Sequence, residues 1–130
     1  MRSGKLFILM AVLVGCTGPW EVEEETLLDP PASYQAWFAQ VASCMGQGSS
    51  RAAADYHRIE WYSAMDIRNQ GDGVKAWGLW TEPHKITIRR DQIGNPEVVM
   101  HEIIHDLLQS GSHEAGYFGT CDDSVVRSAD

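Results

Sequence analysis

The chain has 130 residues, of which 44% are hydrophobic, and this is the size and composition of one small globular domain with a single core. Acids outnumber bases, so the formal net charge is −8, and no run of lysines and arginines forms a basic patch. Because nucleic-acid binding depends largely on such a patch, nucleic acid is excluded as an expected partner.

Residues 1–15 have the pattern of an export signal. A positively charged start precedes an apolar run, Leu6–Val14, that is too short to span a bilayer comfortably. The run ends in Leu13-Val14-Gly15-Cys16, which resembles the lipobox of bacterial lipoproteins. This resemblance implies cleavage before Cys16, acylation of that cysteine and a lipid anchor in the bacterial cell envelope, and Thr17 after it implies the outer membrane. An ordinary secretory signal that contains a cysteine by chance is the alternative.

The next segment, 16–32, predicts an acidic, proline-containing tether. Its acids repel one another, and Pro30-Pro31 ends it stiffly. The folded domain is therefore expected over 33–130. It begins with a helix from Ser33, the expected N-cap, to about Met45. Aromatic and aliphatic side chains recur there at helical spacing, which predicts one face packed in the core.

Three strands are predicted after this helix, at 58–65, 74–80 and 85–89. In the first and last of them, apolar side chains alternate with polar ones. The sequence of 69–73, Asn-Gln-Gly-Asp-Gly, is a turn signal and predicts a hairpin before the second strand.

A second helix is predicted from Pro96. Asn95 is a favourable N-cap, Pro96 suits the first helical position, and Ser110-Gly111 signals the end. The residues after it read as an irregular tail. This helix carries the most informative motif of the chain, His101-Glu102-Ile103-Ile104-His105.

This pentad is an HExxH motif. Two histidines at i and i+4 lie on one face of a helix, so His101 and His105 can reach one metal ion. Glu102 projects beside that ion, where it can take a proton from a bound water. The pattern predicts a Zn²⁺ site with Glu102 as general base. An exposed helix with two solvated histidines is the alternative.

The remaining cysteines, Cys44 and Cys121, form an even pair in a chain that carries an export signal, which predicts a disulfide. Two buried free thiols are the alternative. The predicted bond would tie the first helix to the tail after the second.

The order of these elements, together with the HExxH motif, resembles the zincins, which are zinc metallopeptidases. In detail the chain is similar to small bacterial zincin-like lipoproteins. The resemblance rests on the lipobox, the early helix with Trp37 and Cys44, and the HEIIHDLL run of the second helix. It implies a minimal α+β domain with a backing helix, a small sheet, the active-site helix and an irregular tail. It also implies a peptide or protein substrate, and an edge strand such as 85–89 could pair with it.

His113 is the expected third ligand, because Gly111 lets the chain turn back after the helix and similar families use a histidine placed in this way. Glu114 and Asp123 remain alternatives, the latter in a Gly-Thr-x-x-Asp pattern, and a site without a third protein ligand is a further one. The spacing departs from that of the metzincins, which would need glycine at 108 and histidine at 111. Leu108 and Gly111 stand there instead, so membership of that subgroup does not follow.

Two functions therefore compete. The first is a membrane-anchored zinc metallopeptidase, and the second is a non-catalytic lipoprotein that binds zinc or an envelope partner on the same scaffold. Of the other polar residues, His84 reads as a surface histidine, and Tyr117 either stabilises an oxyanion or packs the tail onto the helix.

Overall fold

The computed structural model describes residues 19–48 and 55–122. The predicted signal segment 1–15, the lipidation site Cys16 and the alternative ligand Asp123 lie outside the described residues. Within the two described ranges, no helix combines the length and the apolar character needed to cross a membrane.

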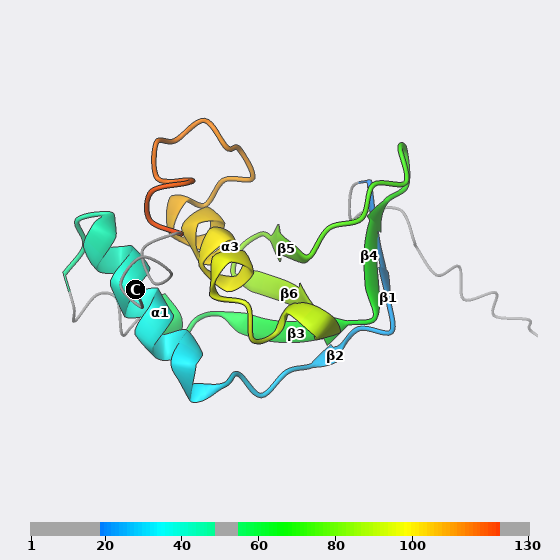
Figure 1. Ribbon diagram of the computed structural model, residues 1–130, viewed down its shortest axis with the longest axis horizontal. Helices are drawn as coiled ribbons and strands as arrows, with labels where there is room; N and C mark the ends of the chain where they lie inside the picture. The colour runs from blue at the N-terminus through cyan, green and yellow to red at the C-terminus, as the bar shows by residue number, and fades with distance from the viewer. Residues whose placement is uncertain (1–18, 49–54, 123–130) are drawn as a thin grey trace, which may run out of the picture.

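The fold is α+β, as predicted, with two helices and two small sheets in the described part of the chain (Figure 1). In chain order the elements are β1 (Trp20–Glu23), β2 (Thr26–Leu27), α1 (Ala32–Cys44), β3 (Glu60–Ala64), β4 (Asp66–Asn69), β5 (Gly78–Thr81), β6 (Lys85–Arg89), a 3-10 turn η1 (Arg90–Gln92) and α3 (Pro96–Leu108).

The larger sheet has the strand order β2-β3-β6-β5. β6 runs parallel to β3 and antiparallel to β5, so it is hydrogen-bonded on both sides. Its bounds confirm the predicted strand at 85–89. The expectation that this strand could pair with a substrate is wrong, because an inner strand has no free edge. The outer strands of this sheet are β2 and β5, and β5 is the one that lies beside α3.

The smaller sheet is a two-stranded antiparallel ribbon of β1 and β4. β1 lies in the segment that we expected to be a solvated tether. Within it, exposed Glu21 and Glu23 alternate with the partly buried Trp20 and Val22, so one side of the strand can pack while the acids stay in water. The alternation of packed and solvated side chains along the strand therefore matters more here than the repulsion between the two acids. β4 was not predicted.

The turn signal at 69–73 is confirmed, although its hairpin joins β4 to residues 74–76. The backbone N–H of Asn69 donates to the carbonyl of Val74, and that of Ala76 donates to the carbonyl of Ile67. The side chain of Asn69 accepts from the backbone N–H of Gly71 at 2.8 Å and so holds the turn. The predicted second strand, 74–80, is divided between this hairpin and β5.

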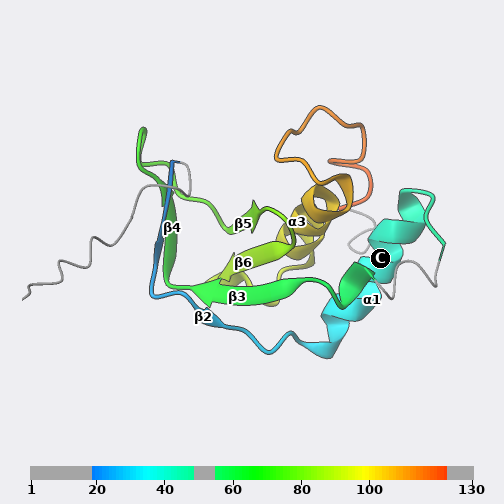
Figure 2. The ribbon, with the colours of Figure 1, turned by 180° about the vertical axis from the view of Figure 1, so that it is seen from behind.

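The core lies between the two helices and one face of the larger sheet (Figure 2). α1 begins one residue before the predicted Ser33, with Pro31 as N-cap and no side-chain cap. Its apolar face is nevertheless as predicted, since Tyr34, Phe38 and Val41 are fully buried. The fully buried residues that they meet come from β6 and α3: Ile86, Ile88, Val99, Met100, Ile103 and Ile104.

Cys44 and Cys121 form a disulfide, in agreement with the prediction from the cysteine count. Their Cα atoms are 5.7 Å apart, and 77 positions separate them in the chain. The bond fixes the end of the described tail to the last residue of α1. It therefore restrains the loop that follows α3, which carries His113.

Candidate metal centre

Local interactions define both ends of α3. The side chain of Asn95 accepts a hydrogen bond from the backbone N–H of Glu97, which confirms the predicted N-cap, and Pro96 occupies the first helical position. The helix ends earlier than predicted, because Gln109 adopts the left-handed conformation at φ 52°. This residue turns the chain back over the helix, a role that the sequence suggested for Ser110-Gly111.

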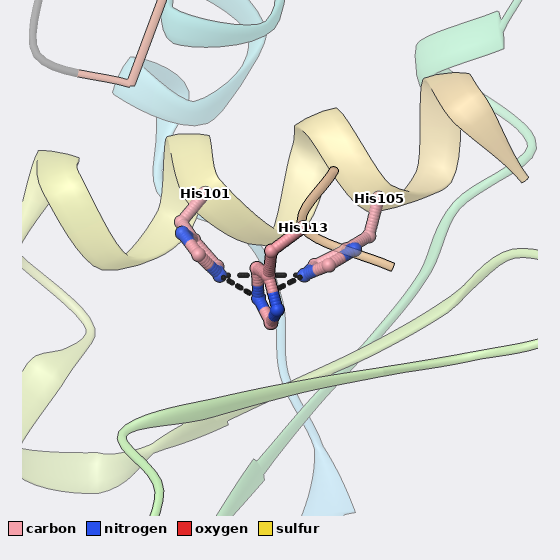
Figure 3. Close-up of side chains that lie close together, drawn as sticks. All are labelled: His101, His105 and His113. Atoms are coloured by element: carbon pink, nitrogen blue, oxygen red, sulfur yellow. Dashed lines mark hydrogen bonds between the residues drawn. The ribbon is translucent and has the colours of Figure 1, made fainter. Parts of the chain in front are cut away.

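The three predicted metal ligands converge. His101 and His105 extend from one face of α3, and the loop after the helix brings His113 opposite them (Figure 3). The Nε2 atom of His113 lies 3.1 Å from Nε2 of His101 and 3.1 Å from Nε2 of His105, and the last two atoms are 3.3 Å apart. Residues 12 positions apart in the chain thus present three imidazole nitrogens to one point.

The second ring nitrogens of the two helical histidines have acceptors nearby. Nδ1 of His105 lies 2.8 Å from the carbonyl oxygen of Ser110, and Nδ1 of His101 lies 3.4 Å from a carboxylate oxygen of Asp122. With the proton held at Nδ1, the lone pair at Nε2 is free for a metal ion. Neither acceptor was predicted. The sequence offered no signal for Ser110, and it drew attention to the neighbouring Asp123 rather than to Asp122.

Burial favours the neutral imidazole at both helical positions. It lowers the pKa of His101, with a further lowering from His113, while Asp122 acts in the opposite direction. Burial also lowers the pKa of His105, against the hydrogen bond to Ser110, and the two other histidines add to the lowering. Metal ions bind the neutral ring, so both shifts favour metal binding at neutral pH.

The ring of Phe118 packs against all three imidazoles. Its centroid lies 4.9 Å from that of His101, 4.8 Å from that of His105 and 5.0 Å from that of His113. An aromatic ring at nearly equal distance from three ligands limits how far any of them can rotate. Phe118 belongs to the tail that the disulfide restrains, so the fold supports the cluster from this side as well.

Glu102 is nearly fully buried, with a relative exposure of 6%. Its carboxylate accepts a hydrogen bond from the backbone N–H of Trp80 in β5. Burial raises its pKa to about 8, against the effect of that hydrogen bond. At that pKa Glu102 is largely protonated at neutral pH, and a positive charge at the histidine cluster would lower the pKa and favour the carboxylate that can accept a proton.

A buried polar network connects β5 to the helix. Asp106, at 3% exposure, accepts a hydrogen bond from Nε1 of Trp80 at 3.0 Å and lies 3.1 Å from Nδ1 of His84. The indole of Trp80 in turn stacks on His105, with centroids 6.3 Å apart and an interplanar angle of 19°. The interpretation of His84 as a surface histidine is therefore incomplete. The sequence did contain a sign of this network. Asp106 is a charged residue three positions after Ile103, within the apolar stripe of the helix, where a buried partner is needed.

The cluster opens into a cleft of about 550 Å³. Its lining includes residues of β5, Val98, Glu102 and the three histidines. Tyr117 is not among the residues that line the cleft and packs against the core, which agrees with the second of the two interpretations, packing of the tail. Glu114 is exposed and does not belong to the histidine group.

Comparison with known proteins gives no relative for this chain: no family model, no curated protein and no solved structure matches it.

Proposed function

We propose that the protein is a zinc-dependent hydrolase that cleaves peptide bonds. One observation carries the proposal: three Nε2 atoms lie within 3.3 Å of one another, in the same cleft as a buried glutamate. Three neutral nitrogen ligands with room for a water are typical of catalytic zinc sites, whereas structural sites are usually closed by four ligands.

The spacing of the three nitrogens fits one zinc ion. At a Zn–N distance of about 2.0–2.1 Å, tetrahedral geometry separates two ligand nitrogens by roughly 3.3–3.4 Å. The separations in this cluster are 3.1–3.3 Å. All three donors are imidazoles, which suit zinc better than magnesium or calcium, since those ions prefer oxygen ligands.

Zinc held here would supply a water of lowered pKa and polarise the substrate carbonyl. Glu102 would accept the proton of that water and pass it to the leaving amine. The hydrogen bond from Trp80 holds its carboxylate on the cleft side of β5. His101, His105 and His113 would hold the metal, and the acceptors at Ser110 and Asp122 would fix the first two rings.

The free edge of β5 is the element that would align an extended substrate. The carbonyl of Trp77 accepts from the backbone of Arg89 in β6. In antiparallel pairing, the alternate residues Gly78 and Trp80 therefore direct their backbone groups away from β6. The N–H of Trp80 donates to Glu102, so a peptide would pair with the backbone of Gly78 and the carbonyl of Trp80. A peptide added at this edge would lie across the mouth of the histidine cluster.

The arrangement supports a minimal zincin-like domain. α1 would be the backing helix, the larger sheet would carry the edge strand, and α3 would be the active-site helix. The likeness is one of element order and motif.

The test is metal content and turnover in matched variants. We expect about one zinc per chain, its loss in His101→Ala and His105→Ala, and a strong reduction in His113→Ala. His57→Ala, at an exposed histidine away from the cleft, is the control. Glu102→Gln should retain zinc and lose turnover of a peptide library, whereas Glu60→Gln should retain both. Unchanged zinc content in all three histidine variants would refute the metal site.

A non-catalytic zinc protein is the second candidate. The observation in its favour is the 6% exposure of Glu102, whose carboxylate is occupied by the backbone of β5. In that case zinc would stabilise the fold, and the cleft would bind a partner. Zinc-loaded protein that cleaves no peptide in a broad library, while chelation lowers its melting temperature, would favour this candidate over the hydrolase.

We further propose a lipid anchor at Cys16 and an outer-membrane location, on the basis of the lipobox-like sequence. Cys16→Ser should prevent acylation and release the protein from detergent-extracted membranes. Mass spectrometry of the mature N-terminus is the direct check, and an unmodified Cys16 would refute the anchor.

A further inference from the structure

The cleft has two unlike sides. One side consists of the histidine cluster with the loop after α3. The other consists of Lys75, Ala76 and Trp77, which lead into β5, together with Trp20 from β1. Both ribbon views place β5 between the loop after α3 and the ribbon of β1 and β4 (Figures 1 and 2). A substrate aligned on β5 would therefore have the histidines on one side and two tryptophans on the other.

Trp77 is unusual because it is both large and exposed. Its relative exposure is 53%, whereas most large apolar side chains of the described residues are buried or half-buried. Trp20, at half-burial, lines the same cleft, and Val98 contributes apolar surface from α3. We call Trp20 and Trp77 the tryptophan wall. An exposed aromatic surface inside a cleft is typical of a ligand-binding site.

The backbone around the wall is fixed from both sides. The N–H of Ala76 donates to the carbonyl of Ile67 in β4, and the carbonyl of Trp77 accepts from the N–H of Arg89 in β6. Ile67, which anchors the ribbon, is fully buried. Trp77 is thus held at its backbone while its ring remains available, so a ligand would meet a site that is already formed.

The position of Trp77 in the chain places the wall next to the reacting groups. Trp77 immediately precedes Gly78, whose backbone is packed against the side chain of Glu102. A substrate residue in extended conformation spans about 3.3 Å. A side chain close to the bond at the histidine cluster would therefore come within reach of the wall.

Once zinc is bound, the charges that line the cleft do not favour one sign. Its lining includes the acids Glu97, Glu102 and Asp122, and a single lysine, Lys75, among the described residues. Lys75 itself lies 3.9 Å from a carboxylate oxygen of Asp66. A zinc ion at the histidine cluster would add two positive charges to this lining, so the preference of the wall rests on its apolar surface and not on charge.

We propose that the tryptophan wall is a specificity subsite that accepts a bulky apolar or aromatic side chain next to the scissile peptide bond. The inference rests on the proposed hydrolase function and names its substrate class.

The experiment compares internally quenched peptides that differ at one residue, which is Phe, Leu, Ala or Glu, placed in turn on each side of the cleavable bond. Wild-type zinc-loaded protein should cleave the Phe and Leu peptides with the highest kcat/KM. Trp77→Ala should reduce kcat/KM for the Phe peptide roughly tenfold or more and leave the Ala peptide nearly unchanged. Trp77→Phe should restore most of the preference. Val74→Ala is the control, since Val74 is 58% exposed on the same hairpin but does not line the cleft.

A binding measurement separates the subsite from the hydrolase. Glu102→Gln protein, zinc-loaded, is titrated with the same peptides by calorimetry, with and without Trp77→Ala. Tighter binding of the Phe peptide that is lost with Trp77→Ala would support the subsite. If the wild type at the same time cleaves no peptide, only the proposed hydrolase function is refuted. Turnover with an unchanged Phe-to-Ala ratio in Trp77→Ala would overturn the subsite and leave the hydrolase intact. Equal zinc content and far-ultraviolet circular dichroism of all variants guard against misfolding.

Discussion

Gly78 in β5 and Glu102 in α3 are in direct contact. A Cβ atom placed on Gly78 would lie 2.9 Å from Cγ and 3.2 Å from Oε1 of Glu102. Real Cβ atoms are essentially never found as close as the first of these distances, so the edge strand can approach the helix only because residue 78 has no side chain. The close approach of β5 to α3 also brings the backbone N–H of Trp80 to the carboxylate of Glu102.

The first prediction concerns this contact. In Gly78→Ala the new methyl group would displace Glu102 and press on Val98, whose Cγ1 would lie 3.2 Å away. We expect a loss of about 1–3 kcal/mol in the free energy of unfolding, a reduced kcat and an unchanged zinc content. Gly94→Ala is the matched control, because a Cβ at Gly94 would meet nothing within 4 Å. Denaturant titration and peptide turnover are the measurements, and equal kcat in the two variants would contradict the argument.

The second prediction concerns Asp106. Asp106→Ala would leave the part-buried Nε1 of Trp80 without this acceptor and remove a restraint on the indole that stacks on His105. We expect a destabilisation of about 1–3 kcal/mol together with a change in tryptophan fluorescence. Asp106→Asn retains an acceptor oxygen and should restore most of both. If the alanine and asparagine variants are equally stable, the hydrogen bond from Trp80 has no measurable role.

The third prediction concerns Phe118. Phe118→Ala removes the ring that contacts the three imidazoles, so we expect zinc affinity to fall by roughly tenfold, as for other residues that orient metal ligands. Phe118→Leu should lose less, because it keeps apolar volume beside the cluster. Competition with a chromogenic chelator measures the affinity. Tyr117→Phe serves as the control, and a fall of the same size there would mean that general loosening of the tail, rather than the ring of Phe118, is responsible.

The fourth prediction concerns the disulfide. A cross-link over 77 positions should contribute about 4–5 kcal/mol in the chain-entropy model, so its reduction should lower the melting temperature markedly. Cys121 also precedes Asp122, whose carboxylate lies beside His101. Reduction should therefore weaken zinc affinity as well, because binding would then have to order the tail. Peptide mapping under non-reducing conditions and zinc titration of Cys121→Ser are the tests, and unchanged affinity would break the link between bond and metal site.

Much of the site was predictable because it depends on local periodicity. His101, Glu102 and His105 share one face of α3 through the helical repeat alone, and Asn95 and Pro96 set the start of that helix. The disulfide followed from the number of cysteines, and the proximity of His113 to the cluster from a turn shortly after the helix. Each of these features can be predicted from a short stretch of the chain or from the number of cysteines.

The remaining features depend on which segments meet, and the sequence predicted several of them wrongly. It suggested a solvated tether where β1 forms, since the partner β4 lies more than 40 positions away in the chain. It also placed β6 at the edge of the sheet, whereas the outer strands are β2 and β5. No turn near Gly78 in the sequence explains why a glycine is needed there. The reason is its close approach to Glu102, which only the folded structure shows. Long-range strand pairing and close packing between elements depend on the whole fold. The neighbours of a strand and the contacts of a glycine produce no periodic pattern in the sequence, so they cannot be predicted from it in this way.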